Sequence, residues 1–385
     1  MMNKNIKYVG VNDKSLDLFE SQYIIPNGVS YNSYVILDDK IAIMDTVDKR
    51  ARDEWLSNIE NVLQKRQPDY LVVSHMEPDH GANIQALCEL YPKMKIIGNV
   101  KTFTMMEQFF RDFSFEERKI TVKENDTLEL GHHTLRFIMA PMVHWPEVMV
   151  TYEEQEKILF SADAFGKFGA LDCDEDWACE ARRYYFNIVG KYGLQVQALL
   201  KKVSSLDIQT ICPLHGPILK ENLPYYINKY MIWSSYQPED QGVFIAYASI
   251  HGYSEQAAKE LAEMIKETQT QVVISDLSRV DQAEAVEDAF RYSHLVLVAS
   301  SYDGGVFTPM EEFLSHLKSK NYQNRTVAFI ENGSWAPSAY KTMKGIVDTF
   351  KNMTVIDQHI TIRSSLSDEN RKELKELAMQ LIKTR

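Results

Sequence analysis

Four residues that can ligate a metal ion lie within six positions of one another, directly after an apolar run. They are His75, Glu77, Asp79 and His80, in the stretch LVVSHMEPDHG. The apolar run predicts a strand, and the proline and glycine that follow predict a loop. Imidazole and carboxylate groups both ligate divalent and trivalent ions. Because side chains at positions 75, 77 and 79 alternate along the chain, they can converge on one point, and the stretch predicts a metal site.

Three further candidates each follow an apolar run that reads as a strand. His144 comes after RFIMAPMV, Asp163 ends KILFSAD, and His215 lies in TICPLHG. Polar side chains at strand ends reach the loops where sites are built. Any one of them could instead be a turn former or a satisfied polar residue. The whole set at strand-to-loop junctions favours a shared metal site.

A second kind of site is predicted where a strand passes into a helix in the second half of the chain. The six connecting residues are Ser249, Ile250, His251, Gly252, Tyr253 and Ser254. Free backbone N–H groups and the dipole at a helix N-terminus favour a phosphate there, and the two serine hydroxyls can donate to its oxygens. The loop is neither G-x-G-x-x-G nor a P-loop, which disfavours dinucleotides and nucleoside triphosphates.

Two later loops also follow predicted strands and could complete a ligand crevice at the same sheet edge. The loops are SSYDGG, residues 300–305, and ENGSWA, residues 331–336. The candidates within them are Ser301, Tyr302, Asp303, Gly304 and Gly305 in the first, and Asn332, Gly333, Ser334 and Trp335 in the second. Glycines allow close backbone approach, and Tyr302 or Trp335 could stack on a planar ring. Each loop alone could be an ordinary turn, and Trp335 could equally be packed in the core.

The elements that must position these residues fall into two halves. Short β runs with intervening helical patterns fill the first half, including a long helical region that we expect to break near Gly190 and Gly193. The polar segment 234–242 marks a linker. After it, apolar strands alternate regularly with amphipathic helices, which predicts a doubly wound parallel sheet. We therefore expect an α/β protein with domains at residues 1–240 and 241–385.

Composition narrows the class of protein. The 385 residues carry a net charge of -12, which argues against nucleic acid or an anionic membrane as the main partner. The polar start and the lack of a long apolar run predict neither a signal peptide nor a membrane span. The four cysteines contain no C-x-x-C pair, which excludes a rubredoxin-type iron site in this chain and favours reduced thiols in the cytoplasm.

The order of these motifs resembles the flavodiiron proteins (A-type flavoproteins). The pattern H-x-E-x-D-H, followed by HWPE, SADAFG and PLHGP, is similar to the metallo-β-lactamase fold, in which hydrolases show H-x-H-x-D-H. Glu77 replaces the second histidine. The resemblance implies an αββα sandwich of that fold, followed by a flavodoxin-like domain that binds FMN. Tyr253 departs from the small residue usual in the flavodoxin phosphate loop.

The resemblance also implies roles for the metal candidates. One iron would take His75, Glu77 and His144, the other would take Asp79 and His215, and Asp163 would bridge them. His80 would stay outside the coordination sphere as a supporting residue. Tyr192 would donate a hydrogen bond near a diatomic ligand, with plain helix packing as its alternative. Trp145 would lie at a subunit junction or simply pack.

The implied activity is electron transfer from FMN to a non-haem diiron site that reduces O2 to water, NO to N2O, or both. It would require an external donor such as rubredoxin or a flavin-dependent reductase. A head-to-tail homodimer is implied, with a dimer of dimers as a further option. The alternatives are a metal-dependent hydrolase with an accessory flavodoxin domain and a redox carrier without catalysis. An anionic carboxylate in place of an imidazole stabilises ferric iron, so Glu77 favours the oxidoreductase.

Overall fold

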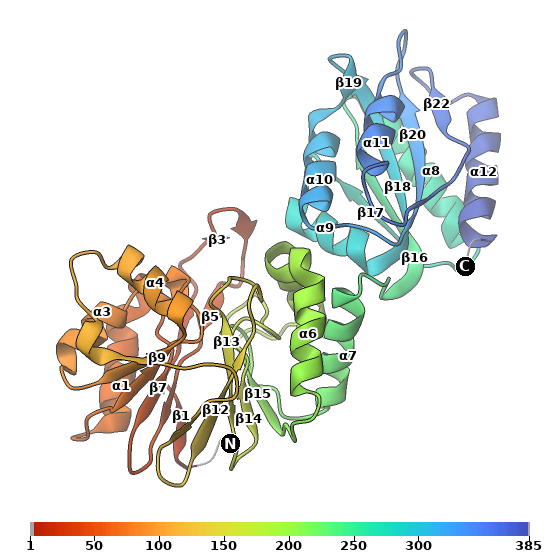
Figure 1. Ribbon diagram of the computed structural model, residues 1–385. Helices are drawn as coiled ribbons and strands as arrows, with labels where there is room; N and C mark the ends of the chain where they lie inside the picture. Colours follow the sequence, from red (N-terminus) through yellow and green to blue (C-terminus); the bar gives the residue numbers. More distant parts are fainter. Residues whose placement is uncertain (1–3, 384–385) are drawn as a thin grey trace. The chain divides into compact units, whose positions relative to one another are not determined.

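The computed structural model describes residues 4–383, and the chain divides into two compact units (Figure 1). The N-terminal unit comprises the chain up to Tyr185 and the segment Tyr192–Met231. The C-terminal unit comprises Phe186–Lys191 and the chain from Ile232 onward.

Two sheets form the centre of the N-terminal unit. The first has the order β1-β6-β7-β8-β9-β10 and the second β11-β12-β13-β14-β15. The strands of the first sheet are β1 (Ile6–Tyr8), β6 (Tyr34–Ile36), β7 (Ala42–Met44), β8 (Tyr70–Val72), β9 (Lys95–Gly98) and β10 (Lys119–Thr121). Those of the second are β11 (Thr127–Glu129), β12 (Thr134–Met139), β13 (Met149–Glu153), β14 (Ile158–Phe160) and β15 (Thr210–Cys212). Two small ribbons pair β2 (Val11–Asp13) with β5 (Val29–Tyr31) and β3 (Leu18–Phe19) with β4 (Tyr23–Ile24).

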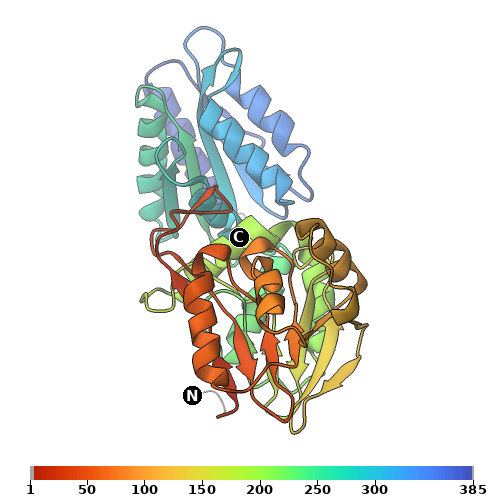
Figure 2. The same ribbon diagram turned by 90° about the vertical axis from the view of Figure 1, so that its left-hand side faces the viewer.

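Apolar side chains hold the two sheets face to face. Ile36 and Val72 of the first sheet and Phe137 and Phe160 of the second belong to one fully buried cluster. Helices lie on the outer faces (Figures 1 and 2). On the first sheet these are α1 (Arg52–Leu63), α3 (Ile84–Leu90) and α4 (Val100–Phe109), and on the second α5 (Trp177–Tyr184), α6 (Gly193–Val203) and α7 (Leu223–Ser234). The predicted αββα sandwich is confirmed.

Strand register places the metal candidates at one edge of the second sheet. Met139, the last residue of β12, pairs with Met149 at the start of β13. Phe160, the last residue of β14, pairs with Thr151 of β13 and with Cys212 at the end of β15. The loops that leave β12, β14 and β15 therefore start side by side, and they carry the three later candidates.

The long helical region breaks where the sequence predicts. α5 ends at Tyr184, a π-helical turn, η3, covers Tyr185–Val189, a 3-10 turn, η4, covers Gly190–Tyr192, and α6 starts at Gly193. The middle of this region packs within the C-terminal unit. Phe186 stacks on Phe290 with ring centroids 4.1 Å apart, and the Tyr236 hydroxyl donates to the Gly190 carbonyl at 2.7 Å.

The C-terminal unit is the predicted doubly wound sheet. Its central strands run parallel in the order β17-β16-β18-β20, with β21 and β22 beyond β20. The strands are β16 (Asp240–Ala248), β17 (Val272–Asp276), β18 (Tyr292–Tyr302), β19 (Gly305–Val306), β20 (Thr326–Asn332), β21 (Thr354–Val355) and β22 (Ile360–Ile362). The order reverses between β16 and β18, the position at which this fold opens a ligand crevice.

Helices cover both faces of this sheet, as Figure 1 shows. They are α8 (Tyr253–Lys266) and α12 (Asp368–Lys383) on one face, and α9 (Gln282–Arg291), α10 (Thr308–Ser319) and α11 (Ala339–Val347) on the other. Leu261 of α8 and Leu377 of α12 pack into one core cluster with the strands. Among residues 4–383, no helix has both the length and the apolar character that crossing a bilayer requires.

A buried arginine ties the C-terminal unit together and yields a stability prediction. Arg325 is 2% exposed, and its guanidinium donates to the carbonyls of Tyr236 and Phe290. Replacing it with methionine removes these donors from buried carbonyls, each worth about 1–3 kcal/mol. We expect Arg325→Met to lower the free energy of unfolding by at least about 2 kcal/mol in urea denaturation followed by circular dichroism. Arg363→Met, at an exposed position, is the control, and an equal loss in both variants would contradict the assignment.

Candidate functional site

The first group of metal-ligand candidates surrounds one point at the strand ends of the N-terminal unit. It consists of His75, Glu77, His144 and Asp163, whose ligand atoms all lie within 4.8 Å of one another. The Glu77 Oε2 atom lies 3.2 Å from His75 Nε2 and 3.0 Å from His144 Nε2. Asp163 Oδ2 lies 3.3 Å and 3.1 Å from the same two nitrogens.

A second group lies beside the first and shares a carboxylate with it. It consists of Asp79, His80 and His215. Asp79 Oδ2 lies 3.2 Å from His215 Nε2 and 3.4 Å from His80 Nε2. The other oxygen of Asp163, Oδ1, lies 3.4 Å from His80 Nε2 and 3.7 Å from His215 Nε2. Asp163 therefore spans the two groups, which is the placement that a bridging ligand needs.

These side chains fit a pair of metal ions. Ligand atoms at about 2.1 Å from an ion and at right angles to each other are separated by about 3.0 Å, close to the separations found here. Both carboxylate oxygens of Asp79 and the Oδ1 atom of Asp163 are buried without a hydrogen-bond partner. Buried polar atoms are nearly always satisfied, so these oxygens indicate a cation. Nitrogen and oxygen donors together suit iron, zinc or manganese.

The charges of the first group also indicate a cation. Burial lowers the pKa of His75, but the Asp163 charge and hydrogen bonds to Glu147 and Glu77 outweigh it and hold that pKa well above its ordinary value. Burial also lowers the pKa of His144, but hydrogen bonds to Asp163 and Glu77 outweigh it and raise that pKa to about 9. The pocket therefore carries an excess of negative charge that metal ions would neutralise.

His80 lies closer to the candidate ligands than the sequence led us to expect. We placed it outside the coordination sphere, whereas its Nε2 atom lies 3.0 Å from His215 Nε2 and points at the same place as the Asp79 carboxylate. The short helix α2 (Pro78–Gly81) has Asp79 and His80 as its middle residues and buries both. The geometry thus offers His80 as a third ligand of the second group.

Three residues that the sequence did not single out hold the ligands from behind. Glu147 Oε1 lies 2.7 Å from His75 Nδ1 and accepts from the Met76 N–H, while the Ser30 carbonyl lies 2.8 Å from His215 Nδ1. Asp45 Oδ1 accepts from the Ser74 N–H at 2.6 Å. Glu147 and the Ser30 carbonyl, which contact ring nitrogens, fix which nitrogen of His75 and His215 faces the metal. Glu147 is the last residue of the HWPE motif, so its place in that motif could have marked it as a partner of the ligands. Nothing in the sequence marks the Ser30 carbonyl in this way.

The tyrosine that packs beside the metal-ligand candidates is Tyr184, whereas the sequence predicted Tyr192 for this place. The Tyr184 ring lies 5.6 Å from that of His215, and burial together with the charges of Asp163, Asp79 and Glu77 raises its pKa well above the ordinary value. Tyr192 is half-buried at the end of η4. The two residues stand on opposite sides of the π-helical turn, and sequence periodicity does not reveal such a turn.

Trp145 packs onto the first group. Its ring meets that of His75 edge to face at 5.2 Å and lies 6.1 Å from that of His144. Of the two roles considered from the sequence, packing is the one visible within this chain.

An opening beside the second group gives small molecules access. A cavity of about 600 Å3 is bounded by Glu77 and Asp79 on one side and by the β3–β4 hairpin on the other. Arg50 and Tyr31 also line it, and the Arg50 guanidinium donates to the Tyr31 hydroxyl at 3.1 Å.

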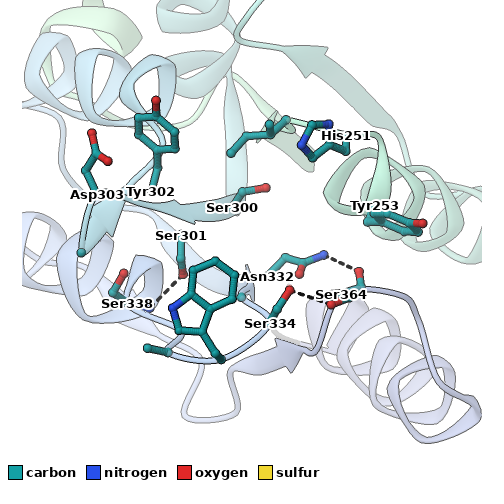
Figure 3. Close-up of a pocket in the computed structure, with 15 residues that line it drawn as sticks. His251, Tyr253, Ser300, Ser301, Tyr302, Asp303, Asn332, Ser334, Ser338 and Ser364 are labelled. Atoms are coloured by element: carbon teal, nitrogen blue, oxygen red, sulfur yellow. Dashed lines mark hydrogen bonds between the residues drawn. The ribbon is translucent and has the colours of Figure 1, made fainter.

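A second cavity, of about 500 Å3, opens at the carboxyl end of the parallel sheet in the C-terminal unit (Figure 3). Its volume lies within the roughly 300–1,000 Å3 of small-molecule and cofactor sites. The predicted residues that line it are Ile250, His251, Tyr253, Ser301, Tyr302, Asp303, Gly304, Asn332, Gly333, Ser334 and Trp335. All three predicted loops therefore meet at one cavity.

Four predicted residues do not line this cavity but shape it. The buried Ser254 hydroxyl bonds with that of Ser300 at 2.9 Å. Ser249 accepts from the Gly252 N–H at 3.1 Å, and Gly252 precedes α8 with a φ of 88°, which favours glycine. Gly305 begins β19.

Two lining residues, Ser338 and Ser364, lie outside the predicted loops, and Ser300 and Ala336 lie at the ends of the predicted stretches 300–305 and 331–336. Ser364 comes from a fourth loop, after β22, and its hydroxyl bonds with that of Ser334 at 2.7 Å. In Figure 3, Ser338 lies on the same side as Ser301, whose hydroxyl accepts from the Ser338 N–H at 2.8 Å. Position after a strand was the only available signal.

The cavity suits a phosphorylated planar ligand. Hydroxyl groups and the start of α8 offer hydrogen-bond donors to a phosphate. Three aromatic side chains at the rim remain exposed, Tyr253 at 48%, Tyr302 at 46% and Trp335 at 89%. Large exposed aromatics beside a cavity are available to stack on a ring system, and Trp335 is clearly not a core residue.

Comparison with known families finds one match in each unit. A family model described as "ODP family beta lactamase" matches residues 29–216, and a "Flavodoxin domain" model matches residues 244–360. The solved structure of a rubredoxin oxygen:oxidoreductase from Desulfovibrio gigas superposes with a TM-score of 0.92 at 24% identity, covering 100% of this chain and 98% of that one.

Two curated relatives add to this. Diflavin flavoprotein A 1 of a Synechocystis species is 32% identical over 76% of this chain and 52% of its own length. The anaerobic nitric oxide reductase flavorubredoxin of Vibrio vulnificus is 29% identical over 87% of this chain and 70% of its own length. The chain thus spans about half the length of the first relative.

The shared position of Asp163 yields a prediction about metal binding. Because its two oxygens face different groups, Asp163→Asn should weaken both metal positions together. We expect the dialysed, iron-reconstituted variant to lose most of both equivalents in elemental analysis, whereas the exposed Asp172→Asn should keep the wild-type content. Loss of one equivalent alone would show that Asp163 serves a single ion.

Proposed function

We infer that this chain, which belongs to the flavodiiron protein family, is an oxidoreductase that holds FMN in its C-terminal unit and two iron ions in its N-terminal unit. The observation that carries this inference is Glu77 among the metal ligands, in a chain that also has an FMN-sized cavity at a doubly wound sheet. FMN takes up one or two electrons, and a pair of irons can pass two electrons at once to a small ligand.

We propose that the metal ligands are those predicted from the sequence. His75, Glu77 and His144 hold one ion, Asp79 and His215 hold the other, and Asp163 bridges them. Glu77 and the bridging carboxylate supply negative charge that favours ferric over divalent zinc binding. We add His80 to this set as a third ligand of the second ion, because its ligand atom lies within 4.8 Å of those of Asp79 and His215.

We propose that the three loops bind FMN by its two ends. The residues from Ser249 to Ser254, at the start of α8, take the phosphate with backbone N–H groups and serine hydroxyls. Trp335 and Tyr302 stack on the ring system, and the glycines of both later loops let the backbone approach it.

Two substrates are proposed, O2 reduced to water and NO reduced to N2O. The names of the Desulfovibrio gigas and Vibrio vulnificus proteins support one substrate each. Tyr184 holds a proton beside the site, because burial and then the nearby carboxylates keep its pKa well above the ordinary value. The cavity at the β3–β4 hairpin admits a diatomic molecule.

Partners and location are proposals as well. Rubredoxin or a flavin-dependent reductase would supply the electrons, and residues 1–385 contain no C-x-x-C pair for a rubredoxin-type iron site. A head-to-tail homodimer would bring the FMN of one subunit to the irons of its partner. Cytoplasmic location is supported by the buried thiols of Cys88 and Cys212. We retain residue 240 as the proposed domain boundary.

The test is turnover of both gases by one preparation. The purified protein is analysed for iron and FMN, reduced anaerobically, and given O2 or NO in parallel with a competent donor. We expect sustained consumption of at least one gas. If neither gas is consumed by iron- and FMN-loaded protein, the proposed function fails; a stoichiometric burst alone would mark a carrier, and zinc filling with rapid ester hydrolysis would favour the hydrolase.

A substitution of Glu77 tests most directly whether the site favours iron and gas reduction over zinc. Glu77→His converts the ligand pattern into that of the hydrolases, so we expect bound zinc to rise relative to iron and gas reduction to be lost. Metal analysis after growth with both metals and gas-consumption assays measure the two effects. Glu129→His, on exposed β11, is the control. Retained iron together with full activity would refute the role given to Glu77.

The choice between the two tyrosines is also testable. Tyr184→Phe removes the proton beside the site, and we expect kcat to fall by about 100-fold or more with iron content unchanged. Tyr192→Phe should leave kcat within about twofold of the wild type. The reverse order of effects would restore the residue predicted from the sequence.

A further inference from the structure

The histidines of the two metal-ligand groups differ in what stands behind them. His75 Nδ1 lies 2.7 Å from Glu147 Oε1, and both side chains are completely buried. His215 Nδ1 bonds instead with a neutral backbone carbonyl, that of Ser30. The Nδ1 atom of His80 is buried without a hydrogen-bond partner. Of these three histidines, only His75 has a carboxylate hydrogen-bonded to its Nδ1 atom.

Glu147 is held so that its charge acts on His75. Its Oε1 atom accepts from the Met76 N–H at 2.8 Å as well as facing His75, and its Oε2 atom is buried without a partner. No solvent screens the carboxylate, because the side chain is 0% exposed. A carboxylate that accepts from the outer nitrogen of a ligating imidazole makes the inner nitrogen more basic. The greater electron donation stabilises the higher oxidation state of the metal.

We propose that Glu147 is a positioning residue that makes the two metal positions electronically unequal. The ion at His75 retains the ferric state more strongly, and the ion at Asp79 and His215 is reduced first. This inference rests on the proposed function, since it requires iron in both positions. Each position takes one electron as Fe(III) becomes Fe(II), no covalent bond is broken, and the electron comes from reduced FMN in turnover.

The test is an anaerobic redox titration of the full-length protein loaded with iron and FMN. Dithionite supplies the electrons, and the mixed-valence iron signal is followed by electron paramagnetic resonance. Glu147→Gln keeps the shape of the side chain and removes its charge. We expect the later of the two iron reduction steps to move to a more positive potential while the earlier step stays. The equilibrium constant for forming the mixed-valence pair should fall by about 10–100-fold, by analogy with the range by which loss of an outer partner changes metal affinity.

The chain contains a matched control at the other end of β13. His133 Nδ1 lies 3.0 Å from Glu153 Oε1, and both side chains are completely buried, but neither belongs to a metal-ligand group among the described residues. Glu153→Gln therefore makes the same chemical change in a buried Glu–His pair away from the irons. We expect both iron steps to stay where they are in the wild type.

Each outcome decides the proposal. If Glu147→Gln leaves both steps unmoved or moves both alike, or if Glu153→Gln reproduces its effect, the proposal is overturned. If Glu147→Gln loses its iron, the Glu147→Asp variant decides, because it keeps the charge on a shorter side chain. The later iron reduction step must then move in the same direction by a smaller amount. A later step that does not move overturns the proposal. A wild-type protein that binds no iron pair would instead refute the proposed function.

Discussion

The carboxylate of Asp163 is the constraint on which the metal site depends. Its two oxygens face four imidazoles that come from three separate loops. A carboxylate buried to this degree is tolerated only where positive charge or metal surrounds it. The three loops must therefore place their imidazoles around Asp163 at the same time. The face-to-face packing of two sheets achieves this, because it brings the end of β8 to the same edge as the ends of β12, β14 and β15. The hydrophobic core therefore sets the distances between ligands, although it contains none of them.

The second site is assembled by a different principle. Every loop at the carboxyl edge of a parallel sheet starts where a strand ends, so neighbouring strands deliver neighbouring loops without any special contact between them. What distinguishes this edge is the small size of most residues in those loops. Serines bond with one another across them, as Ser334 and Ser364 do, and so hold two loops together while large aromatic side chains stay exposed beside the cavity.

Sequence reasoning reached both sites because each depends on local order along the chain. Strand-to-loop junctions could be recognised one at a time, and all six predicted ligands fall into the two groups. Sequence reasoning could not predict contacts between residues that are distant along the chain. The Ser30 carbonyl behind His215 depends on a pairing 185 residues away, and a backbone acceptor has no residue-type signature. Tyr184 was missed in favour of Tyr192 because a π-helical turn shifts helical phase without a sequence marker. The position of His80 was judged from resemblance, whereas α2 fixes the direction of its ring.

The segment Phe186–Lys191 limits how modular this chain is. Although it lies far from the C-terminal domain in the sequence, it provides the ring that stacks on Phe290 and the carbonyl that accepts from Tyr236. A gene fragment that starts at residue 240, where β16 begins, would encode every strand and helix of the doubly wound sheet and still leave Phe290 without the ring that stacks on it. Recombination that exchanges the flavin-binding half between relatives would have to carry these six residues with it. The N-terminal and C-terminal halves of the gene must therefore be inherited together, because a six-residue stretch encoded in the first half completes the packing of the second.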